Sequence, residues 1–222
     1  MRRIFLLSPA QTGGPRAEMV LNPNAGFELA RQLHRGESVP IGELFSFLSG
    51  LYFRGKLAYA RGFAKPGKKG IWIITSNKGL APPEMRVDIE MFRAFGKVPI
   101  NTDNRVYSEP LERDAFKLAD SMKTNDEAVL LGSISTGKYA EILLKAFGSR
   151  LKFPVDFVGR GDMSRGGLLL RRVREGVELE YASLEGAVLR GKRPAKLAPS
   201  RIRHRDLHAR FAQCCEAIED AL

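Results

Sequence analysis

Four segments, residues 8–14, 75–79, 132–139 and 159–167, combine glycine with hydroxyl side chains. All but the first also contain lysine or arginine. Glycine lets backbone N–H groups approach an oxyanion, hydroxyls donate hydrogen bonds, and cations supply charge. All four segments are expected at the carboxyl end of one parallel sheet, where open α/β proteins bind ligands. The pattern predicts one pocket for negatively charged oxygen atoms.

Gly132–Tyr139 matches the phosphate loop G-x-x-x-x-G-K-[ST] except at its last position, where Tyr139 replaces Ser or Thr. It follows an apolar strand and precedes a helical pattern, as such a loop requires. The missing hydroxyl normally binds Mg²⁺, and no apolar run ends in a Walker B aspartate. We therefore expect a loop that holds a phosphate or a sugar rather than a nucleoside triphosphatase. A turn whose glycines serve geometry alone is the alternative.

Residues 159–167 place Arg160, Asp162, Ser164 and Arg165 among four glycines. Arginine suits bidentate recognition of phosphate. Asp162 is the candidate catalytic group, either as a base or as the group that orients an arginine. The alternative is an Arg–Asp pair that only stiffens the loop.

The same reasoning extends to the other polar segments. The residues expected to contact the substrate or its phosphate are Ser8, Ser76, Lys78, Gly132, Ser133, Thr136, Gly137, Lys138, Arg160, Ser164 and Arg165. No cofactor and no metal site are expected. His204 and His208 have a spacing that suits a metal on a helix, but their basic surroundings disfavour a cation.

Tyr52, Lys56 and Tyr59 fall on one face of a predicted helix. An aromatic ring beside a cation can stack a base and pair with phosphate, so Tyr52 and Lys56 are candidates for a pocket wall. The alternative is a partly buried packing face from which the lysine amine reaches outward to solvent.

The elements that must position these residues alternate between strands and helices. Short apolar runs predict buried strands at 4–7, 71–75 and 128–131, and a fourth, nearer an edge, at 153–158. Amphipathic spacing predicts helices at 41–64, 111–122 and 139–147. The alternation indicates an α/β fold: a single three-layer domain with a mainly parallel sheet.

The pattern changes after Gly166-Gly167. Two apolar runs around Arg174-Glu175-Gly176 predict a β-hairpin near 168–182. The predicted α/β domain covers residues 1–189. Residues 190–222 form a basic linker and a C-terminal helix, about 206–222, expected to pack on that domain.

The chain has 222 residues, a formal net charge of +11 and no apolar run long enough to span a membrane. Residues 190–210 carry eight basic side chains and one acidic, and so +7 of that charge. The excess favours anionic partners such as nucleotides or nucleic acid. Cys214 and Cys215 are the only cysteines, and sequence neighbours rarely form a disulfide, so the cytoplasm is the expected compartment.

Several segments resemble a family of uncharacterised bacterial proteins, namely 51–60 (LYFRGKLAYA), 131–139 (LGSISTGKY) and 157–167 (FVGRGDMSRGG). The resemblance covers most of residues 1–190 and implies no activity. More weakly, residues 73–84 resemble the strand and turn of α/β domains related to uracil-DNA glycosylases. The catalytic motifs of those glycosylases are not recognisable, so this resemblance implies only nucleobase, nucleotide or nucleic-acid ligands.

Three functional hypotheses follow. The first is an enzyme that acts on a phosphate-bearing substrate, a nucleotide or nucleic acid, at an N-glycosidic or phosphoester bond. The second is a non-catalytic nucleic-acid-binding protein that uses the basic segment 190–210. The third is an assembly subunit, compatible with an oligomer, whose C-terminal helix docks through Leu207, Phe211 and Ile218.

Overall fold

β1 lies near the middle of a six-stranded sheet. In the computed structural model, which describes residues 1–65, 67–134, 137–187, 191, 194, 195 and 197, the strand order is β4-β3-β1-β6-β7-β8. The four central strands run parallel, and β4 and β8 add antiparallel edges. The strands of this sheet are β1 (Arg3–Leu7), β3 (Ile71–Ile74), β4 (Leu80–Ala81), β6 (Glu127–Leu131), β7 (Leu151–Pro154) and β8 (Tyr181–Ser183).

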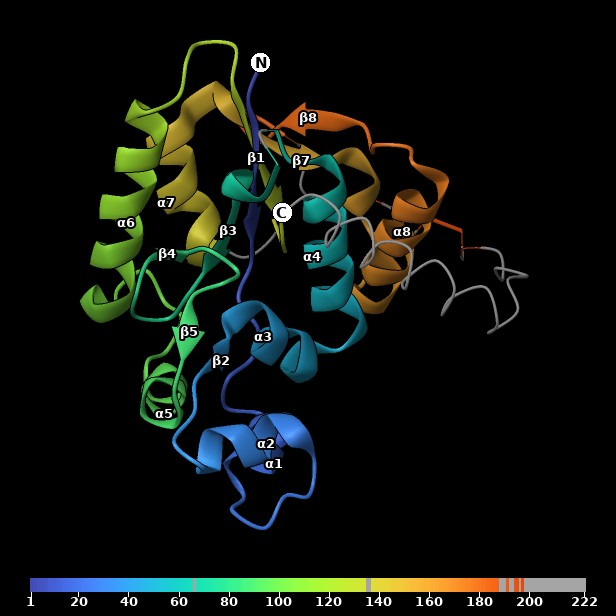
Figure 1. The fold of residues 1–222 in the computed structure, drawn as a ribbon. Helices are drawn as coiled ribbons and strands as arrows, with labels where there is room; N and C mark the ends of the chain where they lie inside the picture. The colour runs from blue at the N-terminus through green and yellow to red at the C-terminus, as the bar shows by residue number, and fades with distance from the viewer. Residues whose placement is uncertain (66, 135–136, 188–190, 192–193, 196, 198–222) are drawn as a thin grey trace, which may run out of the picture.

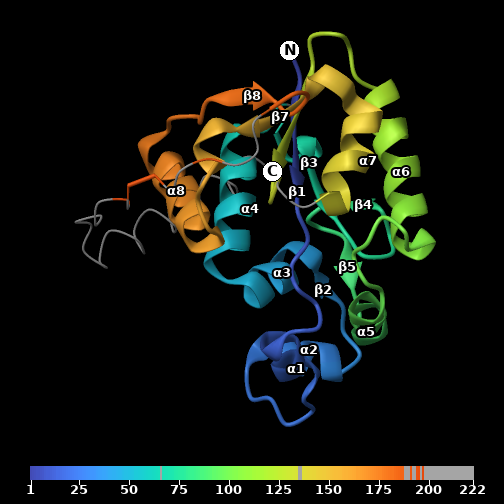
Figure 2. The ribbon, with the colours of Figure 1, turned by 180° about the vertical axis from the view of Figure 1, so that it is seen from behind.

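Helices cover both faces of the sheet, which confirms the predicted three-layer α/β fold (Figure 1). The residues of β1 alternate between two cores: Phe5 and Leu7 face α4 (Leu51–Phe63) and α8 (Asp162–Glu175), whereas Ile4 and Leu6 face the opposite side. There the sheet is covered by α6 (Arg105–Asp120) and α7 (Gly137–Phe147), as the reverse view also shows (Figure 2). Burial on both faces explains why the central strands are continuous apolar runs.

A group of short elements lies beyond the carboxyl ends of the parallel strands, at the bottom of Figure 1. A two-stranded antiparallel ladder joins β2 to β5 within this group. The elements are α1 (Pro15–Leu21), α2 (Glu28–His34), β2 (Val39–Pro40), α3 (Ile41–Ser49), β5 (Arg86–Val87) and α5 (Ile89–Lys97). Three 3-10 turns, η1 (Gly67–Gly70), η2 (Gly148–Arg150) and η3 (Val155–Phe157), complete the elements of the described residues.

The predicted hairpin near 168–182 is wrong. Residues 162–175 form helix α8, which packs its buried Leu168 and Leu169 into the core beside α4. Gly176, which the sequence suggested as the glycine of a hairpin turn, is the left-handed residue (φ 66°) that ends this helix. A run of three leucines satisfies both patterns, because a short apolar run fits a strand or a buried helix turn. Only the second half of the predicted hairpin contains a strand, β8.

Other boundaries also differ from the predictions. The helix predicted over 111–122 is α6, which begins at Arg105 and ends at Asp120. The helix predicted over 41–64 is two helices, because Gly50 takes a positive φ of 55° between α3 and α4. The predicted edge strand at 153–158 is β7, which begins two residues earlier and ends at Pro154. It lies between β6 and β8, so β8 rather than β7 forms the edge of the sheet. The predicted C-terminal helix and most of the basic segment 190–210 lie outside the described residues.

Tyr59 of α4 ties the chain between α8 and β8 to the sheet. Its hydroxyl accepts the Leu179 N–H at 2.6 Å and lies 2.6 Å from the Tyr181 hydroxyl. Tyr59→Phe is expected to lower the free energy of unfolding by about 1–3 kcal/mol, because a buried N–H loses its acceptor. Chemical denaturation measures the change.

Tyr107 provides a matched control for that prediction. It is fully buried in the second core, and its hydroxyl has no hydrogen-bond partner among the described residues. Tyr107→Phe is therefore expected to leave the stability unchanged or raise it. Equal losses in the two variants would contradict the role given to the Tyr59 hydroxyl.

Candidate functional site

The carboxyl ends of β1 and β6 meet at Ser8 and Gly132. The Ser8 N–H donates to Leu131 O at 3.1 Å, which extends the parallel ladder by one residue. A Cβ on Gly132 would lie 2.7 Å from Ser8 Cβ and 2.9 Å from the Tyr139 hydroxyl oxygen. Glycine at position 132 therefore allows Ser8 and Tyr139 to approach each other.

Lys56 of α4 reaches into this edge of the sheet. Its Nζ donates to Ser8 O at 2.7 Å and to Ser8 Oγ at 2.8 Å. The same Nζ lies 4.6 Å from the centre of the Tyr52 ring and 4.8 Å from that of Phe53. Only 1% of Lys56 is exposed, so its amine points inward, unlike the solvent-facing lysine that one interpretation of this helix face expected.

Burial changes the acid–base properties of this cluster. Desolvation lowers the pKa of Lys56 to about 7; Asp162 opposes that shift and Arg165 adds to it. Burial also raises the pKa of Tyr52 and of Tyr139. At neutral pH the Lys56 amine is therefore present in both protonation states, whereas the two phenols keep their protons.

Tyr139 stands where a phosphate loop of the usual kind has Ser or Thr. It is 5% exposed, and its hydroxyl lies near enough to the Ser8 side chain and the Ser133 backbone for both to lower its pKa, against the larger effect of burial. The tyrosine thus also has a hydroxyl, but this group lies beside Ser8 at the carboxyl end of β1. This explains the departure from the motif, which by itself gave no sign of a contact with Ser8.

Two glycines bring α8 against α4 beside Lys56. A Cβ on Gly55 would lie 2.8 Å from Gly166 O, and one on Gly166 would lie 2.8 Å from Leu51 O. The helices therefore touch backbone to backbone. The neighbouring Arg165 is 8% exposed and near enough to Lys56 and Tyr52 for its charge to affect both pKa values.

Arg165 is held by α8 itself and by the turn before it. Its Nε and Nη2 donate to Phe157 O at 3.3 and 3.0 Å, and its Nη1 lies 3.4 Å from Asp162 Oδ1. The Asp162 side chain remains 66% exposed. The Arg–Asp pair expected from the sequence is present, with the arginine buried and the carboxylate at the surface.

Arg160 and Ser164 form a second pair at the start of α8. Arg160 Nη1 donates to Ser164 Oγ at 3.3 Å. Arg160 Nε is buried and has no hydrogen-bond partner within the part of the chain that the structure describes. An unsatisfied guanidinium donor at this place could be satisfied by an oxyanion.

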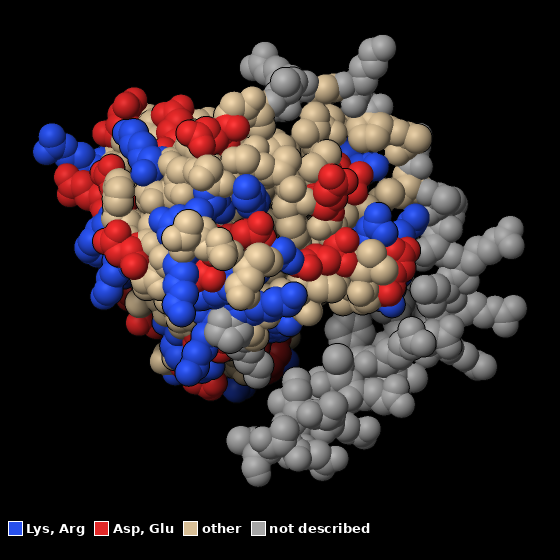
Figure 3. All heavy atoms as spheres, turned by 90° about the horizontal axis from the view of Figure 1, so that it is seen from above, with Lys and Arg blue, Asp and Glu red and all other residues tan. Residues whose placement is uncertain are grey.

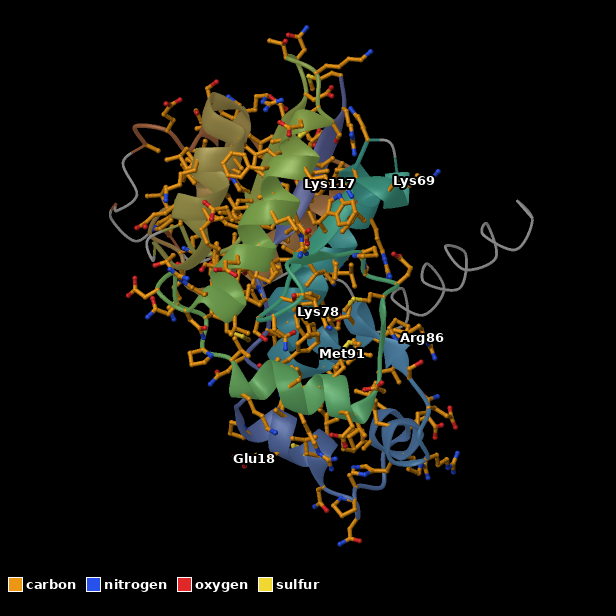
Figure 4. The ribbon with its side chains drawn as sticks, turned by 90° about the vertical axis from the view of Figure 1, so that its left-hand side faces the viewer. Glu18, Lys69, Lys78, Arg86, Met91 and Lys117 are labelled. Carbon is orange, nitrogen blue, oxygen red and sulfur yellow. The ribbon has the colours of Figure 1, made fainter. Side chains whose placement is uncertain are left out.

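The β3–β4 turn uses its polar groups internally. Ser76 Oγ donates to Phe95 O at 2.9 Å and is buried. Thr75 Oγ1 accepts the Lys78 N–H and donates to Gly79 O. Lys78 is exposed, on the side of the molecule that carries α5 and α6 (Figure 4). Among the described residues, the hydrogen bonds of Ser76 and Lys78 go to Phe95 and Thr75 rather than to the cluster around Ser8.

The remaining predicted positions lie at the start of α7. Gly137 and Lys138 are exposed in its first turn, and Ser133 is half-buried. Thr136 lies outside the described residues. The structure thus brings together Ser8, Tyr52, Lys56, Gly132, Asp162 and Arg165, joined by Tyr139.

Other features of the described residues bear on the kind of site. The described residues include no cluster of three metal-ligating side chains, and none of their helices combines the length and apolar character needed to cross a membrane. His34 Nε2 lies 3.1 Å from Val20 O, in a contact between α1 and α2. A hollow of about 530 Å³ lies between α1 and the α3–α4 bend, lined by Arg16, Met19, Ser46, Phe47, Gly50 and Arg54.

The opposite end of the sheet has mixed charge. Figure 3 looks onto the amino ends of the strands, and on the described part of this face basic and acidic side chains are interspersed. Arg3 there pairs with Glu127 at 2.8 Å and with Glu178 at 2.6 Å. This described surface therefore offers no continuous basic patch for an anionic partner.

Comparison of the chain with protein-family models, with curated proteins and with solved structures finds no match.

The contact that sequence reasoning missed is the one between Ser8 and Lys56. Both residues were candidates, but for different tasks, because 48 positions separate them and no spacing rule joins them. The only signal was a lysine on the apolar face of a helix. An amine at that position must find acceptors inside the protein, and the nearest strand end supplies them.

Proposed function

We propose that this protein is an enzyme that acts on a phosphate-bearing substrate, a nucleotide or nucleic acid, and cleaves or transfers a phosphoester or N-glycosidic bond. The observation that carries the proposal is the convergence of Ser8, Lys56 and the Arg165–Asp162 pair at the carboxyl ends of β1 and β6. A buried amine and a buried guanidinium this close repel each other, and such an arrangement is costly unless it serves a task.

The preference for a phosphate rests on the groups beside this cluster. Arg160 keeps one buried donor without a partner among the described residues, and Lys138 is exposed in the first turn of α7. Helix N-termini and guanidinium groups both favour oxyanions. The formal net charge of +11 adds a general attraction for nucleotides and nucleic acid. The adjacent cysteines keep the cytoplasm as the expected compartment.

Asp162 is the residue on which the proposal is tested first. The purified protein is incubated with nucleoside mono-, di- and triphosphates and with single- and double-stranded nucleic acid, and released phosphate, nucleoside and base are separated by chromatography. Asp162→Asn is expected to lower turnover at least about tenfold, because the charge that faces Lys56 and Arg165 is lost whether Asp162 moves a proton or orients Arg165.

Asp103→Asn is the matched control, since it removes an exposed carboxylate from the loop before α6. Full turnover in Asp162→Asn would refute the role given to Asp162. Binding of nucleic acid that falls steeply with salt, with no turnover of any substrate, would instead favour a binding protein that uses residues 190–210.

A further inference from the structure

We infer that Ser8 Oγ is the nucleophile of this site, that Lys56 is its general base, and that the reaction passes through a covalent phosphoseryl intermediate on Ser8. The inference rests on the proposed function and narrows it to a phosphoester or phosphoanhydride bond. Its basis is the direct contact of Nζ and Oγ at 2.8 Å inside the protein. A serine hydroxyl is a weak nucleophile until an adjacent base takes its proton.

The hydrogen-bonding groups around Lys56 match a neutral amine. A neutral amine has two N–H groups and one lone pair, whereas an ammonium has three N–H groups. Nζ donates to Ser8 O at 2.7 Å and to Ser8 Oγ at 2.8 Å; once the amine has lost a proton, its lone pair can take the proton of Ser8 across the second of these contacts. The rings of Tyr52 and Phe53 also contact the amine, with their centres 4.6 and 4.8 Å from Nζ.

Exposure separates the roles of the two residues. Ser8 is 6% exposed and Lys56 is 1% exposed, so both are buried and the serine lies nearer the surface. A Cβ on Gly132 would lie 3.0 Å from Ser8 Oγ and 2.9 Å from the Tyr139 hydroxyl oxygen, so glycine at this position leaves room for both oxygens. Arg165 lies close enough to influence Lys56 and Tyr52, and its charge suits the oxyanion that develops on phosphorus.

The chemistry balances with water as the second reactant. Lys56 Nζ takes the proton of Ser8 while Oγ forms a bond to phosphorus, and the bond from phosphorus to the leaving oxygen breaks. That oxygen takes the proton from Lys56. Water then gives a proton to Lys56 as its oxygen bonds to phosphorus, the Ser8–phosphorus bond breaks, and Ser8 recovers its proton. In this scheme Asp162 is a positioning residue that orients Arg165.

A glycosidic reaction fits this cluster less well. Glycoside hydrolases that cleave O-glycosidic bonds mostly use two carboxylates on either side of the bond. Among the described residues, the contacts and charges around Ser8 and Lys56 bring in one carboxylate, Asp162, which pairs with Arg165. A serine paired with an amine supplies an oxygen nucleophile instead, and phosphorus is its natural target on a phosphate-bearing substrate.

The test is covalent labelling with a fluorophosphonate, an electrophilic phosphorus compound that captures activated serines. The full chain is treated with the probe, intact mass counts the adducts, and peptide mapping locates them. We expect one adduct, on Ser8, and none on denatured protein. Ser8→Ala is expected to abolish it, and Lys56→Met to slow it about 100-fold or more.

The pH dependence of labelling separates a base from a merely structural lysine. Because the pKa of Lys56 is lowered to about 7, the labelling rate is expected to rise with pH and to level off above that value. The charged and titratable groups that face this amine come from α4, α7 and α8: Tyr52, Tyr139, Asp162 and Arg165. Ser149→Ala and Lys117→Met, exposed positions on η2 and α6, should label like the unmodified protein.

The outcomes distinguish this inference from the proposed function. Turnover of a nucleotide that survives Ser8→Ala overturns the inference and leaves the proposed function standing. Labelling of Ser8 without turnover of any phosphate-bearing substrate supports Ser8 and Lys56 as nucleophile and base, and refutes the proposed substrate class. An adduct on another residue, or no adduct, refutes the assignment of Ser8 as the nucleophile. If Lys56→Met fails to fold, the pH profile of the unmodified protein and Ser8→Ala still decide.

Discussion

Gly55→Val is expected to lower the free energy of unfolding by about 3 kcal/mol and to abolish labelling or turnover at Ser8. A Cβ at position 55 would lie 2.8 Å from Gly166 O and 3.1 Å from Gly166 Cα. These are backbone atoms of α8, and they cannot rotate away as a side chain would. The two helices must therefore separate, and α8 carries Asp162 and Arg165 away from Lys56.

The same helix supplies the control for this prediction. Gly62 is exposed on α4, and no atom lies within 4 Å of the Cβ that it would carry. Gly62→Ala is expected to stabilise the protein by up to about 1 kcal/mol, because alanine favours the helix over the unfolded chain. Urea denaturation followed by circular dichroism measures both variants.

Gly166→Ala tests the contact from the side of α8. Its Cβ would lie 2.8 Å from Leu51 O and 2.9 Å from Tyr52 Cα. We expect Gly166→Ala to lower the free energy of unfolding about as much as Gly55→Ala does. Because both substitutions disrupt the same contact between α4 and α8, the double variant is expected to lose less than the sum of the two losses. Additive losses, or a Gly55→Val protein as stable as the unmodified one, would show that the helices do not pack backbone to backbone.

The free energy of unfolding is expected to rise by roughly 2 kcal/mol between pH 7 and pH 9, and Lys56→Met is expected to remove this rise. The pKa of Lys56 is lowered by burial to about 7 in the folded protein, against an ordinary value of 10.5. Between these values the unfolded chain binds the proton and the folded protein does not.

The sign follows from that difference in bound protons. Where the unfolded state holds more protons, raising the pH favours the folded state. The penalty of the lowered pKa is therefore largest below pH 7 and is relieved as the pH rises toward 10.5. The window ends near pH 9, because burial raises the pKa of Tyr52 and Tyr139, and their unfolded forms begin to ionise there.

Lys117→Met controls for the loss of a positive charge at the surface. Lys117 is exposed on α6 (Figure 4), so its removal should leave the rise between pH 7 and pH 9 intact. Guanidinium denaturation at several pH values gives the free energy of unfolding against pH for the unmodified protein, Lys56→Met and Lys117→Met. The same slope in Lys56→Met and the unmodified protein would mean that Lys56 is charged in the folded state, and would remove the support for its role as a base.

The central buried strands can be predicted from the sequence because each depends on a short local pattern. Residues 4–7, 71–75 and 128–131 are short runs of large apolar side chains, and a strand covered on both faces needs such a run. The rule that ligands gather at the carboxyl ends of parallel strands then pointed to Ser8 and Gly132. Both are part of the cluster that the structure brings together.

Helix α8 shows where local patterns fail. The leucines at 168–170 fit a strand as well as a helix, and Gly176 fits a hairpin turn as well as the end of a helix. The choice is made by Gly55 and Gly166, which allow two helices to touch through their backbones. Nothing in either segment alone reveals that its glycine has a partner about 110 positions away.

The α/β class, the central strands and the polar edge of the sheet can be predicted from the sequence, because side-chain periodicity and turn chemistry act over a few residues. The inward contact of Lys56 with Ser8, the position of Tyr139 beside them and the hydrogen bond from Ser76 to Phe95 O become visible only in the folded chain. Such pairings depend on which helices pack together, and a buried amine takes whichever acceptors that packing brings within reach.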